Sequence, residues 1–337
     1  MSSTKDFSKK QKYLEYILPK LTEPQLDRMI ATVQTSKSKV KVEDKDNPYI
    51  QLMEMDGLED AKKMVNAMIA DYRMGKIVEA RGRGTAHSHF HAAFLGNPGC
   101  GKTICARLVA GILFQEGITK KASFVEATRT DLCGQYVGET AQKVKDVFKR
   151  AKDGTLFIDE AYSLVDGGPG SNNNYGKEAI NEIIVHMEND PGTVVIFAGY
   201  CDRMKEFLDS NPGLRSRVSY QVSFRDYTTE ELLKISKTIA KSKGFDLTET
   251  ALERLSAVYE TVKQNKEFGN GRYVRNTIEA AIREKGVHIG VVAAPNLEVY
   301  NDMSVYSDEA LFSLDESCIA SIPESTREEG RPIGFCM

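Results

Sequence analysis

The eight residues GNPGCGKT, at positions 96–103, decide how the sequence is interpreted. They fit the pattern G-x-x-x-x-G-K-[ST], in which glycines let backbone N–H groups turn toward phosphate oxygens. The apolar run FHAAFL (90–95) precedes the motif, and the helical segment TICARLVAGILF (103–114) overlaps its end. A strand before and a helix after are the context that this motif requires, since the helix N-terminus adds partial positive charge beside the phosphates. The stretch therefore predicts a nucleotide-phosphate site.

Two side chains of this motif have expected chemical roles. Lys102 should contact the β- and γ-phosphates, and Thr103 should ligate Mg²⁺. Cys100 lies inside the loop, where a small filler residue is favoured over a redox switch. The residues expected to surround the nucleotide in this stretch are Pro98, Gly99, Cys100, Gly101, Lys102, Thr103 and Ile104.

A second segment, TLFIDE (155–160), delivers two acids after four residues typical of a buried strand. Ligands in open α/β sheets lie at the carboxyl ends of the strands. Asp159 is therefore a candidate to hold Mg²⁺ through its hydration shell, and Glu160 to act as the general base on the attacking water. No guanine-specifying N-K-x-D element is evident, so ATP is preferred to GTP.

Further apolar runs, ASFVEA (122–127) and TVVIFAG (193–199), alternate with helical segments. This pattern predicts a mostly parallel sheet covered by helices on both faces. After about residue 228 we expect no further strands, because three amphipathic helices follow. The expected organisation is a helical extension with a charged linker (1–48), an α/β domain (49–227), a small all-α domain (228–290) and a weakly patterned C-terminal extension (291–337).

Composition narrows the class of protein. The 337 residues carry a net charge of −3, which provides no long-range attraction to phosphate backbones and makes a nucleic-acid partner unfavoured. The polar N-terminus has no apolar signal region, no run reaches a membrane span, and the six cysteines form no C-x-x-C pair. We therefore expect a cytoplasmic protein without a membrane partner.

Arginines in two segments are candidates to meet the charge of a hydrolysing γ-phosphate. Arg215 and Arg217 lie in NPGLRSR (211–217), and Arg272 and Arg275 lie in GNGRYVRN (269–276). A cation supplied by another molecule can accelerate such hydrolysis by roughly 10³–10⁵. The alternative is that they are ordinary surface or helix-terminal charges.

The stretch TDLCGQYVGET (130–140) holds the apolar pair Tyr136 and Val137 between Gly134 and Gly138. A loop with polar neighbours has no evident reason to present an aromatic ring, unless the ring packs on its own domain or binds something else.

Three histidines of HSHFH, at positions 87, 89 and 91, alternate along an expected strand and could bind a metal. No cysteine or acid partner is evident, so a structural role leading into the core strand is favoured.

In their order and spacing, GNPGCGKT, LFIDEAYSL (156–164), SNPGLRSRV (210–218) and GNGRYVRN resemble an AAA+ ATPase. The segments MDGLEDAKKMV (55–65), DLCGQYVGETAQKVKDVFKRA (131–151) and AGYCDRMKEFLDSNPGLRSR (198–217) are similar to the group of red-type Rubisco activase and the stage V sporulation protein K-like ATPases. The resemblance covers about residues 50–285.

This resemblance implies a P-loop NTPase sheet with an α-helical lid, Walker A at 96–103, and Walker B at Asp159 and Glu160. It implies that Arg217, with Arg215 as its neighbour, is an arginine finger acting on the next subunit, and that Arg272 is the sensor-2 arginine of the lid. The remaining implied nucleotide contacts are Gly57 and Leu58 near the adenine and Tyr200 at the sensor-1 position, where many relatives have Asn or Thr.

The resemblance also implies a homo-oligomeric ring, usually a hexamer. In that ring the triplet Tyr136-Val137-Gly138 is a pore loop that grips a polypeptide, because an aromatic ring packs on many kinds of side chain and the flanking glycine lets the loop move.

The function favoured is therefore an ATP-hydrolysing remodeller that tugs or threads a protein client. The client is open, with red-type Rubisco one possibility. The alternatives are a nucleic-acid-acting ATPase of the clamp-loader or branch-migration type, and an ATP-dependent assembly switch that does not thread.

Overall fold

The computed structural model describes residues 47–84, 89–136, 138–166, 174–265, 268–288 and 307–320. The expected helical extension, most of its charged linker and the C-terminal tail after residue 320 lie outside the described residues. None of the helices in the described ranges is long and apolar enough to cross a membrane. The first described helix, α3 (Pro48–Glu54), begins at the last residue of the expected linker.

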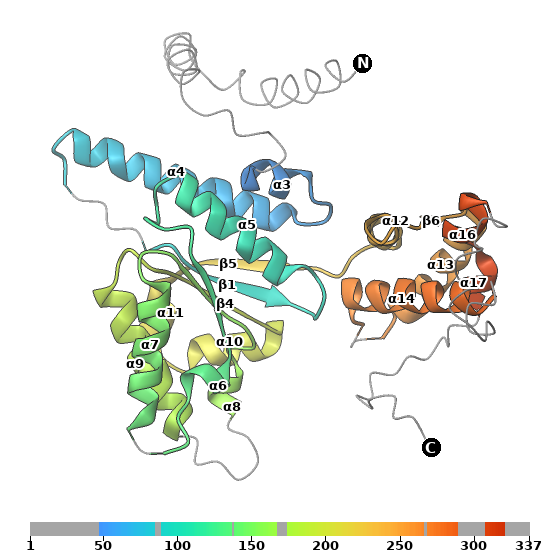
Figure 1. The fold of residues 1–337 in the computed structure, drawn as a ribbon. Helices are drawn as coiled ribbons and strands as arrows, with labels where there is room; N and C mark the ends of the chain where they lie inside the picture. Colours follow the sequence, from blue (N-terminus) through green and yellow to red (C-terminus); the bar gives the residue numbers. More distant parts are fainter. Residues whose placement is uncertain are drawn as a thin grey trace, which may run out of the picture. The chain divides into compact units, whose positions relative to one another are not determined.

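A five-stranded parallel sheet organises the larger domain, which confirms the predicted α/β class (Figure 1). The strand order is β2-β3-β4-β1-β5, so the strand before the phosphate loop lies inside the sheet. The strands are β1 (His91–Gly96), β2 (Phe124–Ala127), β3 (Thr155–Ile158), β4 (Val194–Gly199) and β5 (Val218–Phe224).

Strand β5 was not among the strands expected from apolar runs. It lies at the edge of the sheet and pairs only with β1 among the described strands. Its sequence VSYQVSF alternates buried and more exposed positions, whereas β1, β3 and β4 are buried throughout. A strand covered on one face keeps polar residues on the other, so it lacks the continuous apolar run that marks a central parallel strand.

Helices cover both faces of this sheet (Figure 1). Ala92 and Phe94 of β1 pack against α3, α4 and α5, while Ala93 and Leu95 point to the opposite face and pack with α7, α9 and α10. This division follows from the two-residue period of a strand. The helices of the domain are α4 (Glu59–Ala80), α5 (Lys102–Gln115), α6 (Arg129–Leu132), α7 (Glu139–Ala151), α8 (Ser163–Asp166), α9 (Asn174–Asn189), α10 (Cys201–Asp209) and α11 (Pro212–Arg217).

The three helices predicted after residue 228 are present as α12 (Thr229–Ser242), α13 (Glu249–Val262) and α14 (Asn270–His288). Thr228 starts α12 with a capping box, because its hydroxyl accepts from the Glu231 N–H and the Glu231 carboxylate accepts from the Thr228 N–H. Leu232, Leu255 and Ile278 are fully buried in the core that these helices share.

The expectation that strands end at about residue 228 was wrong. Strand β6 (Asp246–Leu247) pairs in parallel with β7 (Ser313–Leu314), which lies between α16 (Asp308–Phe312) and α17 (Glu316–Ala320). Leu314, Cys318 and Ile319 are buried in the core of the helical domain. Two-residue strands are too short to show a hydrophobic period, so only the long-range pairing reveals them.

His91 is a core residue of β1, as favoured over a metal ligand. Its side chain is buried, and Nδ1 accepts a hydrogen bond from the Val195 N–H at 3.0 Å. Burial, with a smaller contribution from His89, lowers the pKa of His91 to about 4. Among the described residues, no group of three His, Cys, Asp or Glu side chains is placed to hold a metal ion.

Candidate active site

The predicted phosphate loop connects β1 to α5, which confirms its strand–loop–helix context. Gly99 and Gly101 have positive φ values of 70° and 91°, a conformation that favours glycine. A Cβ on Gly99 would lie 2.1 Å from the Gly269 carbonyl oxygen, and one on Gly101 would lie 2.9 Å from the Tyr227 hydroxyl. Gly101 caps α5 without a side-chain hydrogen bond, so the first amides of this helix are available to an anion.

Lys102 lies inside this loop. Its Nζ is 2.7 Å from the carbonyl oxygens of both Gly96 and Asn97, so the ammonium is held against the backbone at the start of the loop. Cys100 is 1% exposed and its thiol donates to the Asn97 carbonyl at 2.9 Å, while burial raises its pKa. These properties fit the filler role expected for Cys100. Thr103 occupies the first turn of α5 and is half-buried, whereas Ile104 is 53% exposed.

The acid pair follows β3 at the carboxyl edge of the sheet. The Asp159 N–H donates to the Ala127 carbonyl at 3.0 Å, and its Oδ1 accepts from the Glu160 N–H at 3.0 Å. Glu160 is exposed with φ 48°, an unusual conformation for a non-glycine residue that is often retained at functional sites. Burial raises the pKa of Tyr162 to about 12, and the Glu160 charge adds to this shift.

Gly57 and Leu58 lie beside the phosphate loop and the start of the helical domain. Gly57 has φ +77°, and a Cβ there would approach Tyr227 and Glu231 to 3.0 Å. Leu58 is buried at the start of α4, with Cδ2 3.9 Å from the Cβ position of Gly101. The structure thus brings Leu58 to the phosphate loop, and Gly57 to Tyr227, whose hydroxyl bonds to that loop, although both residues precede the loop by about forty positions in the sequence.

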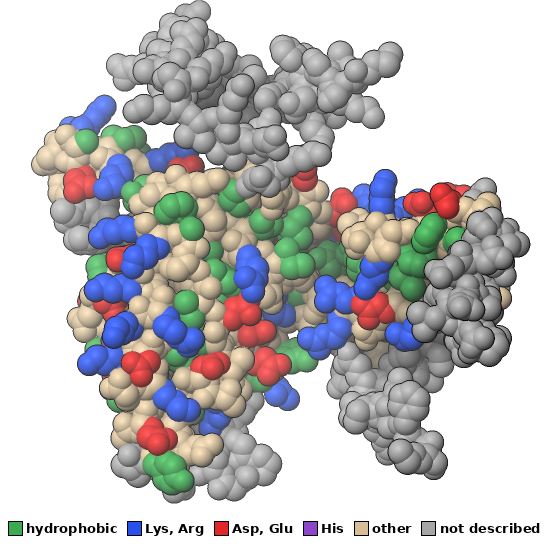
Figure 2. Space-filling model, viewed as in Figure 1, with side chains coloured by type: hydrophobic (Ala, Val, Ile, Leu, Met, Phe, Trp, Pro, Cys, Tyr) green, Lys and Arg blue, Asp and Glu red, His purple; other side chains and the backbone are tan. Residues whose placement is uncertain are grey.

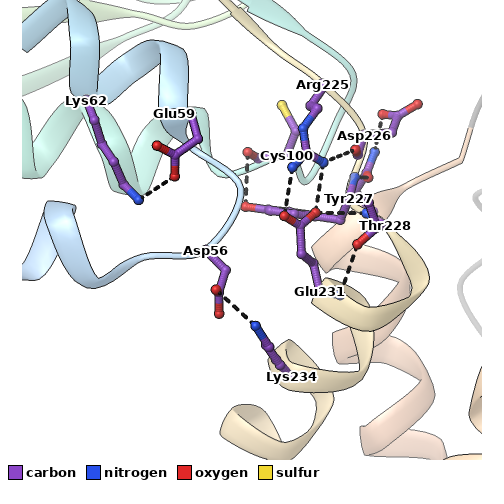
Figure 3. A network of polar contacts seen from close by, with 11 residues as sticks. Asp56, Glu59, Lys62, Cys100, Arg225, Asp226, Tyr227, Thr228, Glu231 and Lys234 are labelled. Carbon is purple, nitrogen blue, oxygen red and sulfur yellow. Dashed lines mark hydrogen bonds and ion pairs between the residues drawn. The ribbon is translucent and has the colours of Figure 1, made fainter.

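The connection between the domains forms a polar network (Figure 3). The Tyr227 hydroxyl donates to the Cys100 carbonyl at 3.2 Å, and burial raises the pKa of Tyr227 to about 12. Arg225 donates twice to Glu231, and this hydrogen bonding lowers the pKa of that carboxyl. Lys234 of α12 pairs with Asp56 at 3.2 Å. These contacts fasten the first lid helix to the segment that carries Gly57.

Asn270 makes a second connection and was not predicted. It is fully buried at the start of α14, where its Oδ1 accepts from the Tyr227 N–H at 3.0 Å and its Nδ2 donates to Asp226 at 2.7 Å. Asp226 also accepts from the Asn97 side chain. The next residue, Gly271, donates its N–H to the Gly99 carbonyl at 3.0 Å. The only sequence signal was an Asn between glycines, a residue that tolerates the observed φ of 46°.

Arg272 follows this contact directly, so its backbone lies against the phosphate loop. Its side chain is exposed, as is that of Arg275 one turn later. The backbone of Arg272 therefore lies at the carboxyl edge of the sheet, beside the phosphate loop.

Arg215 and Arg217 lie at the opposite edge. His91 pairs with Val218 and Gly96 pairs with Phe224, so α11 ends beside the amino end of β1 while the phosphate loop leaves its carboxyl end. At about 3.3 Å per residue, the two ends of β1 are roughly 16 Å apart. The structure does not bring these arginines to the phosphate loop of their own chain.

Tyr200 follows β4 at the same edge as the acid pair and is 37% exposed. Its ring centroid lies 5.7 Å from that of Tyr162, and the Arg203 guanidinium lies 5.1 Å from the Tyr162 ring centroid and 6.0 Å from that of Tyr200. Tyr200, at the predicted sensor position, therefore belongs to a cluster with Tyr162 and the Arg203 guanidinium.

The Tyr136 ring is 70% exposed, which disfavours the alternative that it packs on its own domain. The backbone that carries it is held in place, because Glu139 Oε2 accepts from the N–H groups of Gln135 at 2.9 Å and of Tyr136 at 3.2 Å. Gly138 follows with φ 86° as the N-cap of α7. Val137 lies outside the described residues.

An open parallel sheet with a phosphate-binding loop after one strand and acids after another is the architecture of P-loop nucleoside triphosphatases. Comparison with known proteins narrows this class. Residues 92–226 match the family described as ATPase family associated with various cellular activities (AAA), and residues 228–304 match the AAA lid domain. The chain belongs to the AAA family of ATPases, in the group that includes red-type Rubisco activases.

Three relatives illustrate the group. Stage V sporulation protein K of Bacillus subtilis is 38% identical over 69% of this chain and 73% of its own length. The chloroplastic ribulose bisphosphate carboxylase/oxygenase activase of Cyanidioschyzon merolae is 37% identical over 77% of this chain and 88% of its own. Protein CbbX of Cereibacter sphaeroides is 43% identical over 59% of this chain and 64% of its own. The matches confirm the predicted family and its ATPase activity.

Proposed function

We propose that this ATPase works as a homo-oligomeric ring, expected to be a hexamer, that pulls on a protein client through its central pore. The position of Arg217 carries the proposal. It lies at the sheet edge opposite its own phosphate loop, so an arginine finger at this position acts on the nucleotide of a neighbouring subunit. A site that needs a finger from a neighbour hydrolyses ATP only in an assembly.

Within each site, the residues supply binding and proton transfer. Lys102 and the α5 amides bind the phosphates, Thr103 and Asp159 supply the oxygens that suit Mg²⁺, and Glu160 takes the proton of the attacking water. Bound Mg²⁺ neutralises phosphate charge. Arg272 reaches the nucleotide from the lid, while Gly57, Leu58 and Tyr200 complete its surroundings.

Tyr136 supports the remodelling half of the proposal. An exposed aromatic ring on a braced loop, followed by a glycine with positive φ, suits repeated contact with varied polypeptides. The relative named as a Rubisco activase makes Rubisco one candidate client. Because an aromatic loop packs on many polypeptides, the loop by itself does not select the client.

A nucleic-acid substrate is the less favoured class. The chain carries a net charge of −3, and acidic and basic side chains are interspersed on the face shown in Figure 2. Backbone binding to nucleic acid instead gathers Lys and Arg on one surface. The assembly switch that does not thread remains the second candidate, favoured by the polar network that links the lid to the phosphate loop.

The test is affinity capture with the Glu160→Gln variant in the presence of ATP. This variant should bind nucleotide but hydrolyse it slowly, and so retain the ring and its client together. We expect one enriched protein that is lost in Glu160→Gln/Tyr136→Ala and kept in Glu160→Gln/Tyr136→Phe. Retention regardless of Tyr136 would favour the switch, and retained nucleic acid would overturn the proposal.

A further inference from the structure

The helix that carries Arg217 is only six residues long, too short to be stable by itself. Two polar contacts fasten it to the longer helix α9. At its start, the Asn211 amide donates to the Asn181 side chain of α9 at 3.2 Å. Asn211 Oδ1 also caps α11 itself by accepting from the Gly213 N–H at 2.8 Å. At its end, Arg217 pairs with Glu188. The orientation of α11 is therefore set from α9.

The contacts of the Arg217 guanidinium are directional. Nε and Nη2 both donate to Glu188 Oε2, at 2.9 and 2.5 Å, and Nη1 donates to the Gly213 carbonyl at 3.0 Å. A guanidinium has five N–H groups, so these three bonds leave two, one on each terminal nitrogen. No further hydrogen bond of this side chain is formed with the described residues. Two terminal N–H groups are the arrangement that binds a phosphate in a bidentate manner.

The neighbouring arginine provides a contrast. The Arg215 side chain is 69% exposed and its partner Asp209 is 58% exposed, as in surface ion pairs that contribute little. The Arg217 side chain is only 23% exposed, because its guanidinium lies against α9 and the α11 backbone. A held side chain loses less conformational entropy when it meets a ligand than a mobile one does.

We propose that Glu188 is the positioning residue of the arginine finger. It holds the Nε edge of Arg217 so that the two terminal N–H groups point to the γ-phosphate of the neighbouring subunit. This inference rests on the proposed function, in which Arg217 acts between subunits. It gives α9 a role in hydrolysis without contact between Glu188 and the nucleotide.

The first test measures steady-state ATP hydrolysis. Glu188→Ala should lower kcat by about 10- to 100-fold while leaving the KM for ATP within about twofold, since misplacing a catalytic group mainly affects the transition state. Glu188→Gln keeps an acceptor oxygen and should lose less. Asp209→Ala, which removes the carboxylate beside Arg215, is the matched control and should change kcat less than twofold. Equal kcat in Glu188→Ala and the unmodified protein would overturn the inference.

The second test uses mixed rings and separates positioning from folding. Lys102→Ala subunits should not bind ATP productively but carry an intact finger. Mixed with Glu188→Ala subunits, they should restore hydrolysis, because the sites of the latter then receive a well-placed finger. A Glu188→Ala defect that persists in mixtures would overturn the positioning role and indicate damage to the variant's own site.

The same mixtures distinguish this inference from the proposed function. Arg217→Ala subunits mixed with Lys102→Ala subunits should also recover activity if fingers act between subunits. If Arg217→Ala recovers in mixtures and Glu188→Ala has unchanged kcat, only the positioning role of Glu188 would be rejected, and the finger between subunits would stand. No recovery for Arg217→Ala would reject the trans finger itself, and the positioning role with it.

Discussion

At the scale of single residues, Asn270 connects the lid to the phosphate loop through one buried amide. Both ends of its side chain are used, by the Tyr227 N–H and by Asp226, and its backbone adopts φ 46°. Asn combines two properties here that few residues share, because it tolerates positive φ and offers a donor and an acceptor.

We predict that Asn270→Ala lowers the free energy of unfolding by about 2–4 kcal/mol, from unsatisfied buried partners and a strained alanine backbone. Asn270→Gly removes the backbone strain but still leaves the buried partners unsatisfied. Its loss of unfolding free energy should therefore be about 1 kcal/mol smaller than that of Asn270→Ala. Urea denaturation of the two variants measures the difference. Losses equal in both variants would contradict a backbone contribution.

At the scale of elements, β1 contains a histidine that stays neutral. The folded protein protonates His91 only near pH 4, while the unfolded chain takes up the proton near pH 6.5. Between these values the unfolded state binds more protons, so stability decreases as the pH falls. The groups that influence it are His89, Arg217 and the Met187 backbone.

The expected outcome is a loss of about 3 kcal/mol between pH 7 and pH 4 from this residue. In His91→Asn, the Oδ1 can still accept from Val195 but does not titrate, so this part of the pH dependence should disappear. Denaturation curves at several pH values check it. The same slope in both proteins would show that another group titrates.

The loop of Tyr136 is braced by the first residue of α7. Glu139 accepts from two loop amides, and Lys143 donates to the carbonyls of Thr130 at 3.0 Å and Cys133 at 2.8 Å. The proposed function requires this loop to pull on a client, and a loop that pulls needs such a support, because an unrestrained chain would yield.

Glu139→Ala should therefore increase hydrogen exchange at the Gln135 and Tyr136 amides by about tenfold, as expected when a local hydrogen bond is lost. Glu139→Gln retains an acceptor and should have a smaller effect. Exchange detected by NMR resolves the two amides. Unchanged rates in Glu139→Ala would mean that other contacts hold the loop.

At the scale of the whole molecule, the sheet separates the phosphate loop from Arg217 of the same chain. The phosphate loop leaves its carboxyl edge and Arg217 lies at its amino edge. In the proposed function, one subunit therefore offers a nucleotide site on one side and an arginine finger on the other. This arrangement suits head-to-tail association, which closes into a ring when the rotation allows it.

We predict that ATPase activity per subunit increases with protein concentration until assembly is complete. Arg217→Ala should lower the activity by about 10³-fold or more and abolish its dependence on protein concentration. Activity assays alongside analytical ultracentrifugation test both statements. Constant specific activity through the dissociation range would contradict a shared site.

The sequence by itself determined the parts that depend on neighbouring residues. The sequence predicted the phosphate loop GNPGCGKT between a strand and a helix, the acids after β3 and the three lid helices. Glycine conformations, strand burial and helix periodicity depend on residues that are close in the sequence. The continuous apolar runs of β1, β3 and β4 also predicted a parallel sheet. The alternating edge strand β5 and the short β6–β7 pair were missed, since they lack such a run.

Only the tertiary structure decided which distant groups meet. Asn270 reaches Asp226 and Gly271 reaches Gly99 across long stretches of chain, and no local period encodes those pairs. The separation of Arg217 from its own phosphate loop, and its contact with Glu188, depend on where β5 joins the sheet. A motif records the backbone geometry of its own residues, whereas the partners of a side chain depend on the packing of the elements around it.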